Sequence, residues 1–408
     1  MKWVWAHSMR FQPRGHEVYS EAQITHQIWQ RYLLHVDELV VVGRRPESSG
    51  SVLEKYRTPC HGKGVRFELL EGINQPFELL QNTLRVSRCL REVIADAHGV
   101  IARLPSEHGL AAIGLAKQMK KPVAIELVGC PFDALWNNGP AIGKLYAPLL
   151  AARVRRAVKA CNFVLYVTET FLQQRYPSFG VQTHVSNVSL PALDYTKLQT
   201  STAIGVSLAD EPASPQRLEF NIGLIGSFQN ESKGHNTALL ALRELLRKGV
   251  RCRLHLVGVG DYGRWRRVAS ELGVAEAVEF VGVVAPGAPI LEWLNGMDIY
   301  VQPSFAEGLP RALIEAMAAG RSAIGSTAAG IPELLPEECL HKPGDWRQLA
   351  KKLEFAAHNT NWRSDQGKLN RQKAREYAPD VLDRRRSEFW RAFAQHCEVE
   401  AKSGFSSK

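Results

Sequence analysis

The sequence lacks long apolar runs. No window of its 408 residues approaches the roughly 18 uninterrupted apolar residues that a membrane span requires. Residues Met1–His7 also lack the apolar region and small-residue cleavage site of a signal peptide, and they predict a short opening strand. We therefore expect the chain to stay in the cytoplasm.

The cysteines are scattered singly and include no Cys-x-x-Cys pair. An odd, dispersed set argues against a disulfide framework and against a thiolate metal site. We expect most of them to be small buried residues of a protein in a reducing compartment. The seven are Cys60, Cys89, Cys130, Cys161, Cys252, Cys339 and Cys397.

The net charge of +10 is unevenly distributed. Residues 1–195 hold 23 Lys and Arg against 16 Asp and Glu, whereas residues 196–408 hold 28 against 25. This bias suits an anionic partner such as a lipid headgroup or a phosphorylated substrate, but a solubilising surface charge explains it equally well. No recognised nucleic-acid-binding motif accompanies the basic residues, so nucleic acid is not an expected partner.

Short apolar runs alternate with helical patterns, and 45% of the residues are apolar against 23% charged. Runs without polar alternation predict parallel sheets covered on both faces. The length fits two domains of roughly 200 residues each. In the first half we predict strands at 39–43, 99–103, 122–128 and 163–167, with helices at 107–120 and 140–160.

A second series of alternating strand and helix patterns begins after a Ser-, Pro- and Ala-rich linker over residues 200–217. We predict strands at 220–226, 252–258, 278–282, 299–302 and 322–325, with helices at 235–248, 262–272, 311–319 and 345–357.

This pattern predicts an α/β protein of two Rossmann-like domains, residues 1–200 and 218–378, facing each other across a cleft. Each would bind one substrate outside the carboxyl ends of its strands. An amphipathic helix over about 379–396, within a C-terminal segment 379–400, would pack on its own domain or return toward the first. Residues 401–408 would form a tail.

The segment from Glu307 to Glu315 carries the main chemical signal. A strand ends near Gln302, a loop holds Glu307 and Gly308, and a helix starts at Pro310 or Arg311. The free amides of that helix start form an anion site suited to a diphosphate. Glu315 lies in an otherwise apolar helix and needs a partner, for which a ribose diol is suitable.

This segment resembles the Glu-x7-Glu motif of the retaining glycosyltransferases of family 4, which have the GT-B fold. The resemblance continues through most of residues 220–335. It covers the first strand, loop and Lys-Gly pair at 223–234, the loops at 258–261 and 280–282, and the glycine-rich stretch at 325–335 that holds Gly-Ile-Pro-Glu.

The resemblance implies specific roles. Lys233 would neutralise the donor diphosphate, Glu307 would bind hydroxyls of the donor sugar, and Glu315 would hold the ribose. The loop near Gly282 would meet the base. The implied donor-binding residues are Gly226, Ser227, Lys233, Gly260, Asp261, Gly282, Glu307, Gly308, Leu309, Pro310 and Glu315. The family needs no metal or other cofactor, in agreement with the lack of an Asp-x-Asp motif.

The sequence departs from the family pattern at several places. Ser227 stands where many members have an arginine on the diphosphate, so Lys233 acts alone or another cation such as Arg311 compensates. Ala329 replaces the first glycine of a usual pair, and Arg321 follows Gly320 where proline is frequent.

The acceptor side of the first domain is less conspicuous. Gly15 and His16 follow the opening strand in the place of the family's glycine-rich acceptor loop. Arg103 and Glu126 each end a strand, so they could grip an acceptor phosphate or hydroxyl. A salt bridge or a capping role explains these two residues as well.

A helix over residues 146–159 carries Arg153, Arg155, Arg156 and Lys159 beside aliphatic residues. It could lie on an anionic bilayer, or it could be an ordinary helix that covers the sheet with a solvated face.

These features together predict a retaining glycosyltransferase. It would move a sugar from a nucleotide-sugar to a hydroxyl of a glycan or lipid-linked glycan, in the biosynthesis of exopolysaccharide, capsule or lipopolysaccharide. It would be cytoplasmic, or peripheral on the inner membrane face. A sugar-nucleotide epimerase or synthase with the GT-B fold, and a non-catalytic GT-B partner subunit, are the alternatives.

Overall fold

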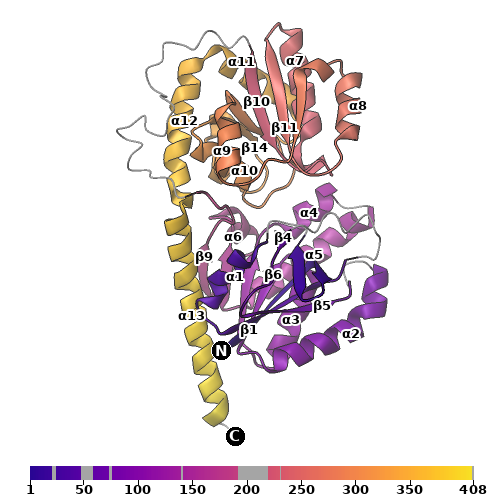
Figure 1. The fold of residues 1–408 in the computed structure, drawn as a ribbon, viewed down its shortest axis with the longest axis vertical. Helices are drawn as coiled ribbons and strands as arrows, with labels where there is room; N and C mark the ends of the chain where they lie inside the picture. The colour runs from indigo at the N-terminus through magenta and orange to yellow at the C-terminus, as the bar shows by residue number, and fades with distance from the viewer. Residues whose placement is uncertain are drawn as a thin grey trace. The chain divides into compact units, whose positions relative to one another are not determined.

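The computed structural model describes residues 1–20, 24–46, 58–72, 76–138, 141–191, 219–229 and 231–406. Their contacts divide the chain into two units (Figure 1). Unit 1 comprises Met1–Pro131, Pro148–Val185 and Asp383–Lys408, and unit 2 comprises Phe132–Ala147 and Ser186–Leu382. The predicted linker at 200–217 lies outside the described residues, as does the end of the predicted tail.

Unit 1 is built on a sheet in which β5, β3, β1, β6, β7, β8 and β9 are parallel neighbours. All four strands that we predicted here are present, as β3, β6, β7 and β8. The strands are β1 (Lys2–Arg14), β2 (Glu17–Ser20), β3 (Glu38–Arg44), β4 (Thr58–Pro59), β5 (Val65–Leu70), β6 (Gly99–Leu104), β7 (Val123–Leu127), β8 (Phe163–Tyr166) and β9 (Val181–His184).

The opening strand is longer than predicted. After its parallel pairing with β3, strand β1 continues to Arg14 and turns back into the antiparallel strand β2, with Arg14 opposite Glu17. Gly15 in this turn has a φ of +62°, a conformation that glycine adopts without steric cost. The expected acceptor loop is therefore the tip of a β-hairpin.

Unit 2 has a six-stranded parallel sheet in the order β12-β11-β10-β13-β14-β15. This is the strand order of a doubly wound Rossmann sheet, which reverses between β10 and β13. All five strands that we predicted here are present, and β15 is additional. The strands are β10 (Phe220–Ile225), β11 (Cys252–Val257), β12 (Val278–Gly282), β13 (Ile299–Gln302), β14 (Ser322–Ser326) and β15 (Leu340–His341).

Helices connect the strands in both units. Buried residues of β10, β11, α7 and α11 share one core in unit 2, and those of β1, β3, α2 and α3 share another in unit 1. The helices are α1 (His26–Leu33), α2 (Pro76–Ala95), α3 (Glu107–Gln118), α4 (Pro131–Asn138), α5 (Ala141–Lys159), α6 (Phe171–Arg175), α7 (His235–Arg247), α8 (Gly263–Glu271), α9 (Ala288–Asn295), α10 (Arg311–Ala318), α11 (Trp346–His358), α12 (Thr360–Ala374) and α13 (Pro379–Ser406).

The C-terminal helix α13 is longer than the predicted 379–396 and includes residues 401–406, so the predicted tail is wrong over these residues. From Asp383 the helix belongs to unit 1. Its Trp390 and Phe393 are fully buried, with ring centroids 5.9 and 5.0 Å from that of Trp3 in β1. The last helix of the chain therefore completes the core of the first unit.

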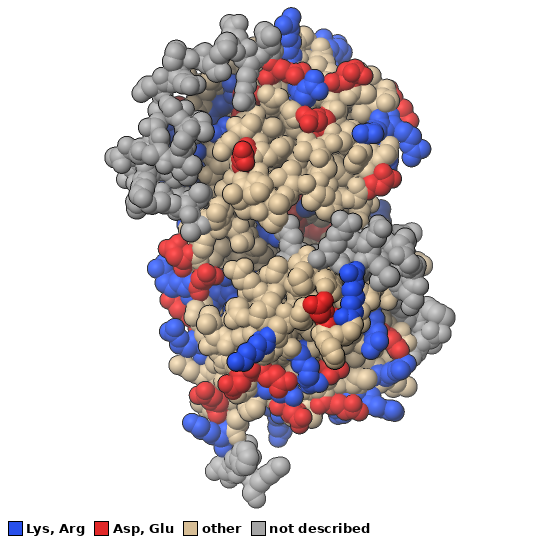
Figure 2. Space-filling model, viewed as in Figure 1, with Lys and Arg blue, Asp and Glu red and all other residues tan. Residues whose placement is uncertain are grey.

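The surface charges are mixed. On the face shown in Figure 2, Lys and Arg side chains lie among Asp and Glu side chains. Among the described residues, no helix combines the length and the apolarity needed to cross a bilayer.

Candidate active site

The loops after β10 and β13 meet at the point where the strand order of unit 2 reverses. Strands β10 and β13 are parallel neighbours, with Gly223 beside Tyr300. The first loop holds Lys233 at the end of a short 3-10 turn, and the second holds Glu307 before helix α10. In open α/β sheets ligands bind in this crevice, outside the carboxyl ends of the strands.

Lys233 and Glu307 form an ion pair, with 2.7 Å between the lysine Nζ and the glutamate Oε1. The side chain of Glu307 is only 7% exposed and that of Lys233 is 28% exposed. Oε1 also accepts from the Ser304 hydroxyl at 2.8 Å and from Gln302 Nε2 at 3.1 Å. All three bonds go to the same oxygen, which leaves Oε2 to accept from a ligand.

Glycines let the loops approach one another more closely than a side chain would allow. A Cβ on Gly258 would lie 1.9 Å from the carbonyl oxygen of Gly226, and one on Gly234 would lie 2.0 Å from that of Pro303. Gly234 also has a φ of +74°. The Phe305 amide donates to the carbonyl of Ser232 at 2.7 Å, which ties the two loops together.

The loops after β11 and β12 complete this edge of the sheet. The amide of Gly258 donates to the carbonyl of Gly282 at 2.8 Å. Gly260 and Gly282 have φ values of +106° and +84°. Asp261 accepts from the amide of Gly263 at the start of α8, so the structure shows a local capping contact for this predicted donor residue.

Helix α10 starts at Arg311, and Pro310 occupies its N-cap position. Leu309 is buried, and the carbonyl of Gly308 accepts from the Gly330 amide at 3.0 Å. This bond holds the turn before α10 against the glycine-rich stretch. The chain therefore presents a helix N-terminus at the crevice, a favourable place for an anion.

Glu315 lies one turn into α10. Burial raises its pKa to about 7, although Arg311 acts in the opposite direction. Burial in β13 raises the pKa of Tyr300 well above its usual value. The charges of Glu307 and Glu315 raise it further. The charges of both carboxylates of the motif therefore act on one buried strand.

Ser227, which stands in the place of the family's arginine, contacts its own loop and the loop after β11. Its hydroxyl accepts from the Gln229 amide at 3.3 Å and lies 3.4 Å from the carbonyl of Val259. Arg311 is exposed at the first residue of α10, where a cation opposes the helix dipole.

Several residues of the site were missed from the sequence. Tyr300 donates to Gln302 at 2.6 Å, and Gln302 donates to Ser304 at 2.8 Å, which orients the groups around Glu307. His235, beside Lys233, packs between Phe228 and Trp265. Burial, with help from Lys233, lowers the pKa of His235 to about 4 and keeps it neutral. No motif marked these residues, because the roles of Tyr300 and Gln302 depend on strand register and that of His235 depends on two aromatic rings distant in the sequence.

On unit 1, the structure brings Arg103 and Glu126 together. Arg103 donates to Oε2 of the buried Glu126 at 2.9 Å, and Tyr32 donates to Oε1 at 2.6 Å. Burial alone would raise the pKa of Glu126, but Arg103, Arg31 and Tyr32 lower it below its usual range. The salt bridge considered for these residues is therefore present, and Glu126 faces protein groups.

The other two predicted acceptor residues, Gly15 and His16, lie in the β1–β2 turn, where His16 is exposed.

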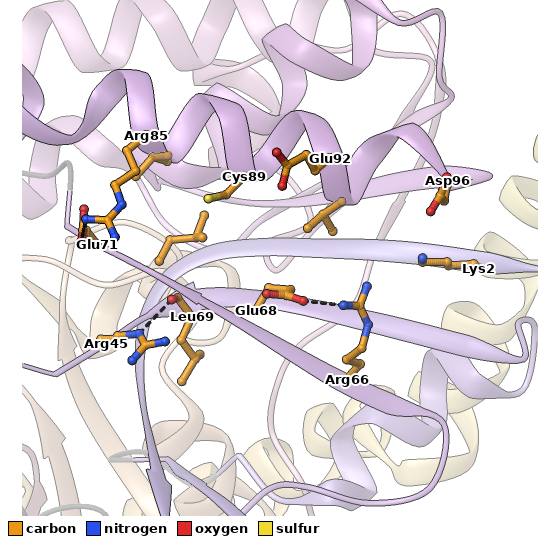
Figure 3. Close-up of a pocket in the computed structure, with 13 residues that line it drawn as sticks. Lys2, Arg45, Arg66, Glu68, Leu69, Glu71, Arg85, Cys89, Glu92 and Asp96 are labelled. Atoms are coloured by element: carbon orange, nitrogen blue, oxygen red, sulfur yellow. Dashed lines mark hydrogen bonds and ion pairs between the residues drawn. The ribbon is translucent and has the colours of Figure 1, made fainter.

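A cavity of about 650 Å³ lies in unit 1 between α2 and the edge strand β5 (Figure 3). Arg66 pairs there with Glu68, and Arg85 pairs with Glu71. Its four cations match four carboxylates, so it offers no net charge to a diphosphate. The charged lining residues are Lys2, Arg45, Arg66, Arg85, Glu68, Glu71, Glu92 and Asp96.

Comparison with known proteins finds a family match over the segment that holds this site. Residues 219–359, which contain the Lys233–Glu307 pair and Glu315, match the family model "Glycosyl transferases group 1". Protein CapJ of Staphylococcus aureus is 29% identical over 85% of this chain and 84% of its own length. The putative colanic acid biosynthesis glycosyltransferase WcaL of Escherichia coli is 32% identical over 30% of this chain and 32% of its own length.

Solved structures match nearly the whole chain. HepE of Anabaena in complex with UDP has a TM-score of 0.61 at 16% identity, covering 99% of this chain and all of HepE. WaaG, a glycosyltransferase involved in lipopolysaccharide biosynthesis, has a TM-score of 0.61 at 14% identity, covering 96% and 99%. The chain has the GT-B fold. The predicted fold class of two Rossmann-like domains is confirmed, and the matches together support a glycosyltransferase.

Proposed function

We propose that this chain is a retaining glycosyltransferase of family 4, which transfers a sugar from a nucleotide-sugar donor to a hydroxyl of a glycan or lipid-linked glycan. The observation that carries the proposal is the Lys233–Glu307 pair at the reversal point of the unit 2 sheet. It lies in the segment that matches the group 1 model.

The donor would bind entirely through groups of unit 2. Lys233, Arg311 and the amides of the α10 start suit its diphosphate. Glu315 would accept from the ribose hydroxyls, and the turn at Gly282 would meet the base. Oε2 of Glu307 would accept from a sugar hydroxyl, while Ser304 and Gln302 keep Oε1 in place. The UDP and UDP-glucose complexes of HepE support a donor of this class.

In the reaction, the bond between the anomeric carbon and the diphosphate oxygen breaks, and the acceptor oxygen bonds to the same face of the sugar. The acceptor hydroxyl would pass its proton to the leaving phosphate. Negative charge grows on the diphosphate, and Lys233 would stabilise it there. Arg311 and the helix amides would share this role, so the proposed reaction needs no metal ion.

The acceptor would bind to unit 1, with Arg103 and the β1–β2 turn at Gly15 and His16 as candidate contacts. Two relatives are named as glycosyltransferases of polysaccharide biosynthesis: WcaL for colanic acid, and AmsK of Erwinia amylovora for amylovoran. They support a role in making an exopolysaccharide, capsule or lipopolysaccharide. We place the reaction in the cytoplasm, at the inner face of the membrane.

The test is a panel of nucleotide-sugars with product analysis. We expect one donor to release its nucleoside diphosphate, and Lys233→Ala and Glu307→Ala to abolish most of the release. We expect NMR to show that the transferred sugar has the same anomeric configuration in the product as in the donor. The opposite configuration would overturn the proposed retention. Conversion of the donor alone into a sugar isomer would indicate an epimerase. The absence of nucleotide-sugar binding in calorimetry would indicate a non-catalytic subunit.

A further inference from the structure

A cavity of about 610 Å³ lies wholly within unit 2, between helix α12 (Figure 1) and the starts of strands β13 and β14. We call it the α12 groove. Its lining positions on α12 recur every three or four residues from Thr360 to Arg375, so one face of this helix forms a wall. The charged residues that line the groove are Arg321, Arg363, Lys368, Arg371, Arg375 and Asp298.

The lining of the α12 groove is strongly basic. Five cations face one carboxylate among the described residues that line it, whereas the cavity beside α2 in unit 1 has four of each. The carboxylate, Asp298, already accepts from the backbone amide of Asn221 at 2.8 Å. Cations gathered in one concave site repel one another and attract anions, so this groove suits a ligand with several negative charges.

Two of the guanidinium groups are held at the C-terminal end of helix α10. Arg321 Nε and Arg371 Nη2 each donate to the carbonyl of Ala319 at 3.2 Å. Gly320 has a φ of +69°, and a Cβ on it would lie 2.4 Å from Nη2 of Arg371, so the glycine leaves room for this guanidinium. Arg321 stands where proline is frequent in the family, and proline has no side-chain donor.

The other three cations lie on α12 or directly after it. Arg363 donates to the carbonyl of Ala357 at 3.1 Å, and a carbonyl, unlike a carboxylate, orients a guanidinium without neutralising it. Lys368 pairs with Asp365 at 3.2 Å, but these side chains are 74% and 71% exposed, so the pair is weak. Arg375 is exposed and pairs with no carboxylate in the described part of the chain. These cations can therefore interact with an anion.

The α12 groove and the donor crevice lie at opposite edges of the unit 2 sheet. Asp298 directly precedes β13 and Ser322 begins β14, so the groove is at the amino ends of these parallel strands. The pair of Lys233 and Glu307 lies beyond the carboxyl ends. A ligand in the groove is therefore distinct from the donor, and the inference does not rest on the proposed function.

We propose that the α12 groove binds a small molecule that carries at least two linked phosphate groups. Its volume is typical of small-molecule sites. Arg363 and Arg375 are twelve residues apart, about 18 Å along a helix, so one phosphate cannot meet both ends of the groove. Arginine binds phosphate oxygens in pairs, and Lys368 adds a point charge. No aromatic side chain is among the described lining residues, so the groove has no stacking platform for a nucleic acid.

Calorimetry of the full chain with inorganic tripolyphosphate tests this site. We expect saturable binding that weakens as the salt concentration rises, and at least about tenfold weaker binding of orthophosphate. Lys368→Glu with Arg375→Glu should weaken tripolyphosphate binding at least about tenfold, because two cations of the groove become carboxylates. Adenosine triphosphate identifies the source of the phosphates: equal affinity would indicate a polyphosphate, and higher affinity would indicate a nucleotide.

Arg243→Glu with Lys351→Glu is the matched control, because it reverses two exposed cations, on α7 and α11, that do not line the groove. It should bind tripolyphosphate like the wild type, and circular dichroism would verify that both double variants are folded. The proposal is overturned by a wild type that does not bind, by a groove variant that binds normally, or by an equal loss in the control. Tighter binding of single-stranded DNA, in competition with tripolyphosphate, would assign the groove to nucleic acid and also overturn it.

Lys233→Ala separates this site from the donor crevice. This variant should retain a tripolyphosphate site, whether or not the wild type releases nucleotide from any donor. Conversely, the Lys368, Arg375 variant should release nucleotide at the wild-type rate when no tripolyphosphate is present. Loss of tripolyphosphate binding in Lys233→Ala, with normal binding in the Lys368, Arg375 variant, would place the probe in the donor crevice and overturn the proposal.

Discussion

The Nζ atom of Lys233 lies 2.7 Å from Oε1 of Glu307, although 74 residues separate them in the sequence. The pair is mostly buried, and Ser304 and Gln302 share the carboxylate. A lysine held in this way is already oriented and partly desolvated, so it can interact strongly with a diphosphate that enters the crevice. When Lys233 shifts toward a diphosphate, the Ser304 hydroxyl and the Gln302 amide still donate to the same oxygen of Glu307.

The first prediction concerns this pair. Lys233→Ala should lower kcat for nucleotide release at least about 100-fold, because the lysine is expected to stabilise charge that grows in the transition state. Glu307→Ala should lower kcat/KM for the donor. The measurement is steady-state release of nucleoside diphosphate from the donor found in the panel.

Lys248→Ala is the control for the loss of an ion pair as such. Lys248 pairs with Glu354 at 2.6 Å elsewhere in unit 2, at a more exposed place. Its removal should cost at most about 1 kcal/mol of stability and leave kcat unchanged. Equal kcat values for Lys233→Ala and Lys248→Ala would contradict the proposed role.

The second prediction is a pH dependence that comes from Glu315. Burial raises the pKa of its carboxyl to about 7, so the group is mostly protonated below that pH. Accepting two hydrogen bonds from a ribose diol requires the carboxylate, and donor affinity should therefore rise as the pH increases through about 7. Calorimetry with the nucleoside diphosphate of the donor, at several pH values, measures this.

The raised pKa of Glu315 also affects the stability of the fold. A carboxyl with a raised pKa is better tolerated in its neutral form, so the free energy of unfolding of the free protein should fall as pH rises from the usual glutamate range to about 7. Glu315→Gln should flatten the pH dependence of both donor affinity and stability. Glu271→Gln, at an exposed position of α8, should change neither pH dependence. An unchanged pH profile in Glu315→Gln would assign the titration to another group.

Much of the fold was predictable because its strands are continuous apolar runs. The predicted strands at 278–282 and 299–302 have the same bounds as β12 and β13. Helix α11 was predicted to within one residue, and Asp345 caps it by accepting from the Gln348 amide. In these segments local propensity and tertiary packing favour the same structure.

Features that depend on long-range pairing were not predictable. The β1–β2 hairpin contains Pro13 and an exposed turn, and nothing in its local sequence shows that it pairs with β4. The network from Tyr300 through Gln302 to Glu307 requires the register of a central strand.

The third prediction tests the close approach of the loops. A Cβ on Gly258 would meet the carbonyl oxygen of Gly226 at 1.9 Å, a backbone atom that cannot rotate away. Gly258→Ala should therefore displace the Lys233 loop, destabilise the protein by about 1–3 kcal/mol and lower kcat/KM about 100-fold. Thermal denaturation and nucleotide release measure the two effects.

Gly114→Ala is the matched control, because a Cβ there meets no atom within 4 Å. Gly114 lies inside helix α3, where alanine is the better helix former. This variant should be stabilised by up to about 1 kcal/mol with unchanged activity. Wild-type activity in Gly258→Ala would show that donor binding does not depend on the spacing of these loops.

The fourth prediction separates the two roles considered for Arg103. Its guanidinium neutralises the buried Glu126, so Arg103→Ala should cost about 3–5 kcal/mol of stability. Because the pKa of Glu126 is lowered in the folded protein, this pair stabilises the fold above the usual pKa range of glutamate, and the contribution is lost as the pH falls. Chemical denaturation at neutral and acidic pH should show a smaller pH dependence in the variant.

Arg153→Ala removes a similar pair with the buried Glu107 and serves as the control. Both variants should be less stable than the wild type. If the exposed part of the Arg103 guanidinium contacts the acceptor, only Arg103→Ala should raise the KM for the acceptor. The KM is measured well below the unfolding temperature of both variants. The same acceptor KM in both variants would make Arg103 a purely structural partner of Glu126, and the β1–β2 turn at His16 would then be the next acceptor contact to test.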